Sequence, residues 1–126
     1  LNYQFENNSF DKILVSLVLE HITDLDLFFQ KVHSILKPYG EILISELHPE
    51  RAANGSFARF TNDDGDEIRL LSISHTEEFI LKSAENTGLK LNFKRDIFGD
   101  PELVKMNEKW GKYLDRRMVQ FWSFFN

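Results

Sequence analysis

Two apolar segments on either side of an amphipathic one constrain the fold of this chain most strongly. Residues Ile13 to Leu19 form a nearly continuous apolar run of strand length, which is typical of a central strand covered on both faces. Residues Glu41 to Leu47, EILISEL, form a second run with little polar alternation. Between them, apolar residues from Leu25 to Leu36 recur at helical spacing. A strand, a helix and a strand within about 38 residues predict a right-handed βαβ crossover.

Short-range signals mark the limits of the predicted helix. Thr23 and Asp26 have the spacing of a hydroxyl and an acid at a helix start. At the other end, Pro38 cannot continue a helix and Gly40 favours a turn. The helix is therefore predicted to end at Lys37.

Downstream of the second strand the pattern is first irregular and then helical. A hairpin or a long excursion is expected around the Asp-Gly turn signal of NDDGD, between residues 56–61 and 67–71. Ser74 or Thr76 is expected to cap a helix that ends at Gly88. The residues of this helix expected to face inward are Phe79, Ile80, Ala84 and Thr87.

Two more strands are expected in the last third of the chain. They cover Leu89 to Phe98 and Arg116 to Phe125, and the polar stretch from Gly99 to Lys112 between them is expected to be a surface loop or a short helix. Because the last strand has no room for a crossover helix before it, we expect it to run antiparallel to its neighbour.

Composition narrows the class of protein. With 126 residues, 42% of them hydrophobic and 28% charged, the chain suits one globular domain. No apolar run approaches the roughly 18 residues of a membrane span, and LNYQFENN lacks the features of a signal peptide, so a cytoplasmic protein is expected. The absence of cysteine excludes disulfides and thiolate metal sites. A net charge of −5 with scattered cations argues against nucleic-acid binding. Because the first residue is Leu1, we expect the chain to be a piece of a longer protein.

The stretch YQFENNSFDKILVSLVLEHITDLDLFFQKVHSILKPYGEILISELHP resembles the second half of a class I S-adenosylmethionine-dependent methyltransferase of the type 11 kind. In members of that family this region typically has a Leu-Pro-Phe-like start, Ser-Phe-Asp, an apolar strand, His, Asp, LKPGG and a strand. The resemblance implies an α/β, Rossmann-like class I methyltransferase fold that is partial, with the family's strands 4, 5, 6 and antiparallel 7 and helices D and E, but without strands 1 to 3. Residues 1–126 would then be the carboxyl-terminal half of one domain, with a hairpin or substrate-cover insertion at about 50–74.

Departures from the family pattern carry further expectations. Tyr39 stands where the family has glycine, which suggests a turn without positive φ at that position. The family's glycine-rich cofactor loop and its ribose-binding acid have no counterpart in the sequence. The strand at Ile13 to Leu19 would lack its neighbour, so a homodimer or domain swap through residues 12–19 is a hypothesis.

The resemblance also implies a cofactor, S-adenosylmethionine, and places residues around it. Ser16 and Leu17 would line its methionine portion, since ligands bind beyond the carboxyl ends of the strands. His48 and Glu46 are the catalytic candidates: either could act as a base, and Glu46 could instead bind a cationic acceptor. The structural alternatives are a loop fixed by Pro49 for His48 and a solvated strand-end carboxylate for Glu46.

Other residues are candidates for binding a small-molecule methyl acceptor. His21, after the first strand, would contact substrate or instead hydrogen-bond to backbone. The substrate-cover candidates in the hairpin region are Phe57, Arg59, Phe60 and Arg69, whose alternative is a decorated surface loop. His75 is interpreted as part of a helix cap. A metal site made of the three histidines and Glu46 is disfavoured, because the histidines lie 27 residues apart and match no compact ligand motif.

The resulting interpretation is methyl transfer from S-adenosylmethionine to a small molecule by a larger enzyme, of which this piece alone would be inactive. The alternative from another class is a catalytically silent, methyltransferase-like module that acts by association. A purely structural α/β interaction domain comes third. The acceptor atom is not specified by these residues, because this scaffold hosts many acceptors.

Overall fold

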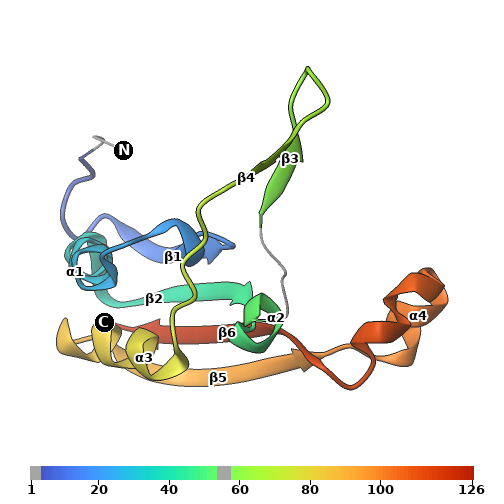
Figure 1. Ribbon diagram of the computed structural model, residues 1–126. Helices are drawn as coiled ribbons and strands as arrows, with labels where there is room; N and C mark the ends of the chain where they lie inside the picture. The colour runs from blue at the N-terminus through green and yellow to red at the C-terminus, as the bar shows by residue number, and fades with distance from the viewer. Residues whose placement is uncertain (1–3, 54–57) are drawn as a thin grey trace.

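The computed structural model describes residues 4–53 and 58–126. A four-stranded sheet has the strand order β1-β2-β6-β5, where β1 is Phe10–Ser16, β2 Leu36–Leu47, β5 Lys90–Phe98 and β6 Arg117–Phe125 (Figure 1). β1 and β2 are parallel, whereas β6 is antiparallel to both β2 and β5. The predicted antiparallel last strand is therefore confirmed, and it lies between the second and third predicted strands.

The core lies between one face of this sheet and two helices, α1 (Leu25–Ile35) and α3 (Glu77–Asn86). Residues at every second position of β1, β2 and β6 point toward the helices, as the strand period of two requires. The buried side chains are Val15, Leu19, Leu25, Phe29, Val32, Leu36, Ile42, Ile44, Ile80, Ala84, Leu89, Trp122 and Phe124. The crossover connection β1-α1-β2 is the predicted βαβ unit.

The first strand lies earlier in the chain than predicted. β1 ends at Ser16 because Leu17 adopts a left-handed conformation with φ 53°, and a short 3₁₀ helix, η1 (Leu19–His21), follows. The strand is also covered on one face only: Leu14 is 77% exposed, and β1 is an edge of the sheet. A continuous apolar run does not distinguish strand from turn, since Leu19 is buried as the first residue of η1 and not as part of the strand.

The turn after α1 corrects two predictions. The helix ends at Ile35, and β2 begins at once with Leu36, because the residues before Pro38 are already extended. Tyr39 has φ 64°, so the expectation that this position avoids positive φ is wrong. This left-handed conformation is strained for a residue with a side chain. The backbone N–H of Tyr39 donates to the carbonyl of Asn126 at 3.1 Å, which stabilises it, and the side chain is 93% exposed.

α3 follows its predicted signals closely. The Thr76 side chain accepts a hydrogen bond from the N–H of Phe79 as N-cap, and Gly88 follows the helix with φ 97°. Ile80 and Ala84 are buried as predicted, but Phe79 is exposed and packs beside His75, with 5.8 Å between ring centroids. The buried face of α3 consists of Ile80, Ser83 and Ala84, which are three and four positions apart. Phe79 directly precedes Ile80 and therefore points away from this face.

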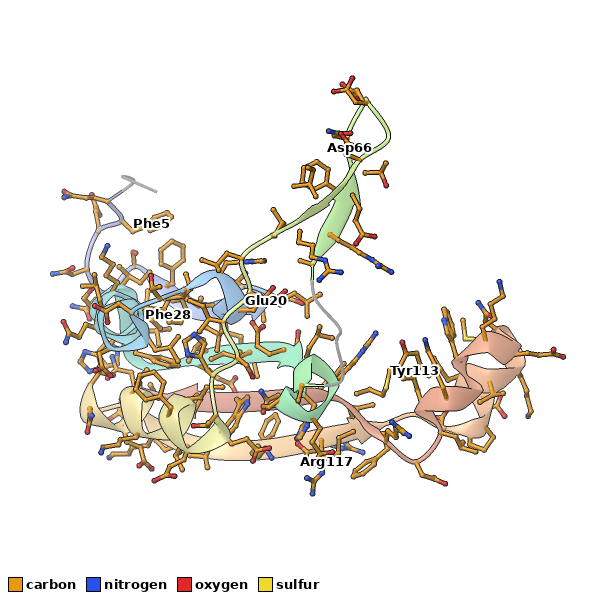
Figure 2. The ribbon with its side chains drawn as sticks, viewed as in Figure 1. Phe5, Glu20, Phe28, Asp66, Tyr113 and Arg117 are labelled. Atoms are coloured by element: carbon orange, nitrogen blue, oxygen red, sulfur yellow. The ribbon has the colours of Figure 1, made fainter. Side chains whose placement is uncertain are left out.

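A small antiparallel hairpin, β3 (Arg59–Thr61) and β4 (Glu67–Arg69), projects away from the sheet (Figure 1). Its turn is organised by Asn62, whose side-chain oxygen accepts the N–H groups of Asp64 and Asp66 at 3.1 and 2.7 Å. Asp66 lies near the hairpin tip (Figure 2). The hairpin therefore lies at a distance from the body of the sheet.

Short helices complete the described part of the chain. α2 (Pro49–Ala53) follows β2, and α4 (Pro101–Met106) and η2 (Glu108–Tyr113) occupy the stretch predicted as loop or short helix. On the sheet face opposite α1 and α3, several apolar side chains are exposed, namely Leu14, Phe93, Ile97, Phe121 and Phe125. Within residues 4–53 and 58–126, no helix has both the length and the apolar character needed to span a membrane.

Candidate active site

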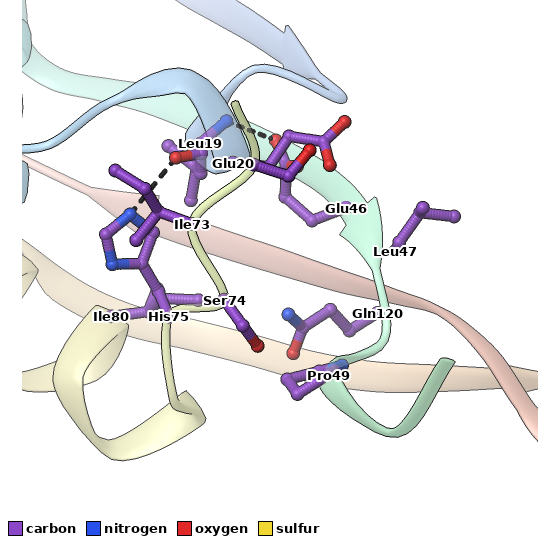
Figure 3. Close-up of a pocket in the computed structure, with 11 residues that line it drawn as sticks. Leu19, Glu20, Glu46, Leu47, Pro49, Ile73, Ser74, His75, Ile80 and Gln120 are labelled. Carbon is purple, nitrogen blue, oxygen red and sulfur yellow. Dashed lines mark hydrogen bonds between the residues drawn. The ribbon is translucent and has the colours of Figure 1, made fainter. Parts of the chain in front are cut away.

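A cavity of about 260 Å³ lies beyond the carboxyl end of β2, between η1, the segment before α3 and the β6 strand (Figure 3). Its lining residues are Leu19, Glu20, Glu46, Leu47, Pro49, Ser72, Ile73, Ser74, His75, Ile80 and Gln120. The carboxyl ends of parallel strands are where open α/β sheets bind ligands. Glu46 is the one residue named as catalytic from the sequence that lines this cavity.

Glu46 is buried at the end of β2 and its side chain faces the same side of the sheet as α3. It is 5% exposed, and its Oε1 accepts hydrogen bonds from the N–H groups of Val18 at 2.9 Å and Leu19 at 3.0 Å. Burial raises the pKa of Glu46, the two N–H groups oppose that effect, and the negative charge of Glu20 adds to it. The carboxyl group is therefore held in place by η1 and takes up a proton more readily than an exposed glutamate.

Two further oxygen atoms in the cavity wall have no hydrogen-bond partner among the described residues. Gln120, the β6 partner of Glu46 across the sheet, is 2% exposed, and its Oε1 is unpartnered. The buried Oγ of Ser72 is in the same condition. An unpaired buried acceptor costs stability, so it calls for a donor from a ligand. The described lining contains the carboxyl groups of Glu20 and Glu46 and no lysine or arginine. With its unpartnered oxygen atoms, this wall suits a cationic or hydrogen-bond-donating group.

His75, in the cavity wall, is hydrogen-bonded to the backbone of η1 and of the residue after it. Its Nε2 lies 3.1 Å from the carbonyl oxygen of Leu19 and 2.8 Å from that of Ile22, and since both oxygens only accept, Nε2 carries the proton. Figure 3 shows the His75 ring beside Leu19. The ring therefore links the start of α3 to the loop after β1, immediately before the helix cap at Thr76.

The loop after β1 holds the two residues expected to contact cofactor. Leu17 is 48% exposed and strained at φ 53°, and its N–H donates to the carbonyl of Ser45 at 2.9 Å. The Oγ of Ser45 donates to that of Ser16 at 2.9 Å, so Ser16 faces the sheet surface opposite the helices. Backbone strain of this kind gathers at functional sites when neighbouring contacts enforce it, as Glu46 does here through Val18.

His48 lies outside the cavity and is buried beside a cluster of partly exposed charged groups. Its Nδ1 accepts the N–H of Glu50 at 3.2 Å, so its Nε2 carries the proton and donates to Glu77 at 2.9 Å. Both ring nitrogens are thus bonded to protein groups. The Nζ of Lys94 lies 2.7 Å from Glu77 and 3.0 Å from Asp96, where it supplies the positive charge between the two carboxylates.

This cluster is the one place in the described chain where three metal-ligating side chains converge. The ligand atoms of His48, Glu77 and Asp96 lie within 4.8 Å of one another. Burial works against the charge of Glu77, but Lys94 and the hydrogen bond from His48 prevail and lower the pKa of Glu77. Because the ammonium group already occupies the position between the carboxylates, the cluster is built as an ion-pair network.

The remaining substrate candidates are not brought to the cavity. His21 Nδ1 donates to the carbonyl of Leu71 at 3.1 Å, which ties η1 to the segment before α3. Arg59 pairs with Glu67 across the hairpin at 3.0 Å, and Phe60 is exposed there. Phe57 lies outside the described residues.

Three polar residues of the cavity were not predicted from the sequence, namely Glu20, Ser72 and Gln120. Gln120 carried a signal, because it is a polar residue at an inward position of an otherwise apolar strand.

Sequence comparison relates the first third of the chain to known methyltransferases. Residues 1–44 match the family described as methyltransferase domain. A 45-residue segment is 42% identical to phosphoethanolamine N-methyltransferase 2 of Caenorhabditis elegans, and this match covers 36% of the chain and 10% of that protein.

Solved structures with the same fold cover nearly the whole chain. An S-adenosylmethionine dependent methyltransferase from Mesorhizobium loti matches with a TM-score of 0.76 at 18% identity, over 99% of this chain and 66% of that one. Phosphoethanolamine N-methyltransferase 2 from Haemonchus contortus, in complex with S-adenosyl-L-methionine, matches with a TM-score of 0.58 at 17% identity, over 98% of this chain and 35% of that one. The chain thus spans only part of each relative, and the predicted α/β, Rossmann-like fold is confirmed.

Proposed function

The chain has the class I methyltransferase fold and carries methyltransferase-domain sequence over residues 1–44, and from this premise we propose that it forms part of an enzyme that methylates a small molecule. The methyl donor proposed is S-adenosylmethionine, whose sulfonium methyl is already electrophilic. The observation that carries the proposal is the placing of a buried, acceptor-rich cavity at the carboxyl end of β2, where this kind of sheet binds its ligands.

Ser16 and Leu17 are proposed to meet the methionine portion of the donor. Their position supports this role, because β1 ends at Ser16 and the strained turn at Leu17 leaves an apolar side chain half-exposed beside a hydroxyl. Glu46 would act on this turn as a positioning residue, since its Oε1 holds the N–H groups of Val18 and Leu19. The polar contacts to the rest of the donor are expected from residues outside this chain.

The acceptor atom proposed is an amine nitrogen. The cavity lining supports it, since an ammonium or amine group supplies the hydrogen-bond donors that Gln120 Oε1 and Ser72 Oγ lack, and its positive charge suits the carboxyl group of Glu46. The relative from Caenorhabditis elegans is a phosphoethanolamine N-methyltransferase by name, which is consistent with an amine acceptor. Because an amine must be unprotonated to attack a methyl group, Glu46 with its raised pKa is the group proposed to accept the amine proton.

A second candidate function is association through β1. This strand is an edge of the sheet, and the exposed Leu14 continues onto an apolar face formed by Phe93 and Phe121. An unpaired apolar edge is a template for another strand. This surface would serve an interaction module that needs no catalysis.

Calorimetric titration with S-adenosylhomocysteine separates the two functions. The titration is made into the 126-residue chain and into a version lengthened upstream along its gene. The enzyme proposal expects binding by the lengthened protein and methylation of an amine when S-adenosylmethionine is supplied. Binding by neither protein would overturn it and leave association through β1 as the better candidate.

A further inference from the structure

A second cavity, of about 430 Å³, lies between α2, η2 and the start of β6. Its lining residues are Glu50, Arg51, Lys112, Tyr113, Arg116, Arg117 and Met118. Figure 2 labels Tyr113, which lies beyond the end of the sheet, and Arg117, which is the first residue of β6. Four of the seven side chains are cationic and one is anionic, in a chain whose net charge is −5. This concentration of positive charge is the strongest departure from the overall acidity of the chain.

One of the four cations is neutralised by the protein itself. Arg117 pairs with Glu50 at 2.8 Å and with Asp96 at 3.3 Å. The other three form no ion pair with a carboxylate of the described residues. Like charges held close together destabilise a fold unless a counter-charge is supplied. The three remaining cations therefore leave room for an anion from solution.

Two of these three cations, Arg51 and Lys112, lie over one aromatic ring. The guanidinium carbon of Arg51 lies 5.1 Å from the centroid of the Tyr113 ring, and the Nζ of Lys112 lies 4.9 Å from it. The Nε of Arg51 is buried and has no hydrogen-bond partner in the described chain. A hydrogen bond from Lys112 and the positive charges of Lys112 and Arg51 lower the pKa of Tyr113. The Nε of Arg51 is thus a buried donor that no acceptor of the described chain uses.

We propose that this cavity binds the phosphate group of a small organic molecule through Arg51, Lys112 and Arg116. Guanidinium groups match phosphate oxygens two at a time, and the Tyr113 hydroxyl adds a further donor. The cavity has the size of a small-molecule site, larger than a bare phosphate needs. Its compact shape suits one anionic group rather than a nucleic-acid strand, which needs a row of cations. This site stands independently of methyl transfer, because its residues do not include the lining of the first cavity.

The test titrates inorganic phosphate and, separately, phenyl phosphate into the 126-residue chain at low ionic strength, followed by amide chemical shifts. Saturable binding is expected for both, tighter for the monoester, with the largest shifts at Arg51, Tyr113 and Arg116. Arg51→Met and Arg116→Met are each expected to weaken binding by about tenfold. The matched control is Lys105→Met, which removes an exposed cation paired with Glu102 on α4 and leaves binding unchanged.

Three results would overturn the proposal. The first is the absence of saturation with either ligand. The second is an equal loss of affinity in Lys105→Met and Arg116→Met, which would show only general attraction to positive charge. The third is equal affinity for the two ligands, which would show binding of a free phosphate and not of an organic one. Circular dichroism verifies the fold of each variant. Because Arg116 is exposed, Arg116→Met is expected to leave the fold intact. This variant therefore tests the site even if Arg51→Met unfolds the protein.

Discussion

Glu46 and Leu19 lie 27 residues apart in the chain, yet the Oε1 of Glu46 accepts the N–H of Leu19 at 3.0 Å. This bond joins the end of β2 to η1 and brings a carboxyl group into the wall of the first cavity. It also places the acid where burial favours its protonated form.

Glu46→Gln is expected to raise the free energy of unfolding at neutral pH by about 1 kcal/mol. The amide oxygen still accepts from Val18 and Leu19, but the buried negative charge is gone. Because the folded pKa of Glu46 lies above its unfolded value of 4.5, wild-type stability falls as pH rises from that value through the folded pKa. The gain in the variant should therefore vanish below about pH 4. Urea unfolding across pH measures it, with the exposed Glu85→Gln as control.

Gln120→Leu is expected to increase stability and decrease affinity for the acceptor. Replacing an unpaired buried amide oxygen by an apolar group should add about 1 kcal/mol to the free energy of unfolding. The same change removes an acceptor from the cavity, so amine binding by the lengthened protein should weaken. Denaturation and calorimetry measure the two effects. A stability loss together with unchanged amine affinity would show that Gln120 serves the core alone; Gln30→Leu, on the exposed side of α1, is the control.

Lys94→Met is expected to destabilise the fold most at neutral pH. Glu77 and Asp96 would lose their shared cation, and the pKa of Glu77 would no longer be lowered by it. A carboxyl group with a lowered pKa contributes stability that is present above its unfolded value of 4.5 and is lost as pH falls through the folded value. The deficit of the variant should therefore shrink in acid. Thermal unfolding between pH 3 and 7 measures it, and an equal deficit at every pH would contradict it.

Tyr39→Gly tests the cost of the left-handed backbone conformation near the start of β2. Glycine adopts φ 64° without the clash that a side chain meets, and the exposed tyrosine ring contributes little packing, so stability should rise by about 0.5–1 kcal/mol. The comparison is Met106→Gly, at the end of α4, which is equally free of burial but has no positive φ and should lose stability. Urea unfolding compares the two variants. A loss in both would mean that the strain at Tyr39 is negligible.

Leu14→Lys tests association through β1. The hypothesis expects the chain to sediment faster as its concentration rises, and a charge on the exposed face beside the free edge should abolish this dependence. Analytical ultracentrifugation measures it, with Met106→Lys on α4 as the control for added charge. A wild-type chain that stays monomeric and soluble at high concentration would remove the hypothesis.

Local signals predicted much of the fold but not the ends of its elements. Thr76 and Gly88 mark the limits of α3 because their chemistry acts within one turn of the helix. The predicted end of β1 lies three residues too late, since the apolar residues Leu17 to Leu19 are compatible with a continued strand and also with the observed turn into η1. Tyr39 likewise takes a conformation that its own preferences disfavour, and its N–H bonds there to the carbonyl of Asn126, a partner far away in the sequence.

For the candidate site, the sequence identified Glu46 from its place at the end of a strand, but not its burial or its partners. Gln120 and Ser72 join it only because β6 pairs antiparallel with β2 and because the segment before α3 passes over η1. The basic cavity was missed for the same reason, since Arg51 lies more than fifty residues before Lys112 and Arg116.

What the sequence alone determined is the set of elements: apolar periodicity, caps and turn residues act over one turn or one strand, and they were sufficient to predict the βαβ unit, α3 and an antiparallel last strand. Only the tertiary structure decided which side chains meet. The order β1-β2-β6-β5 brings Gln120 beside Glu46, places His48 in an ion-pair network and gathers scattered cations around Tyr113. Charge and hydrogen bonding depend on distance in space, which no local pattern in the chain records.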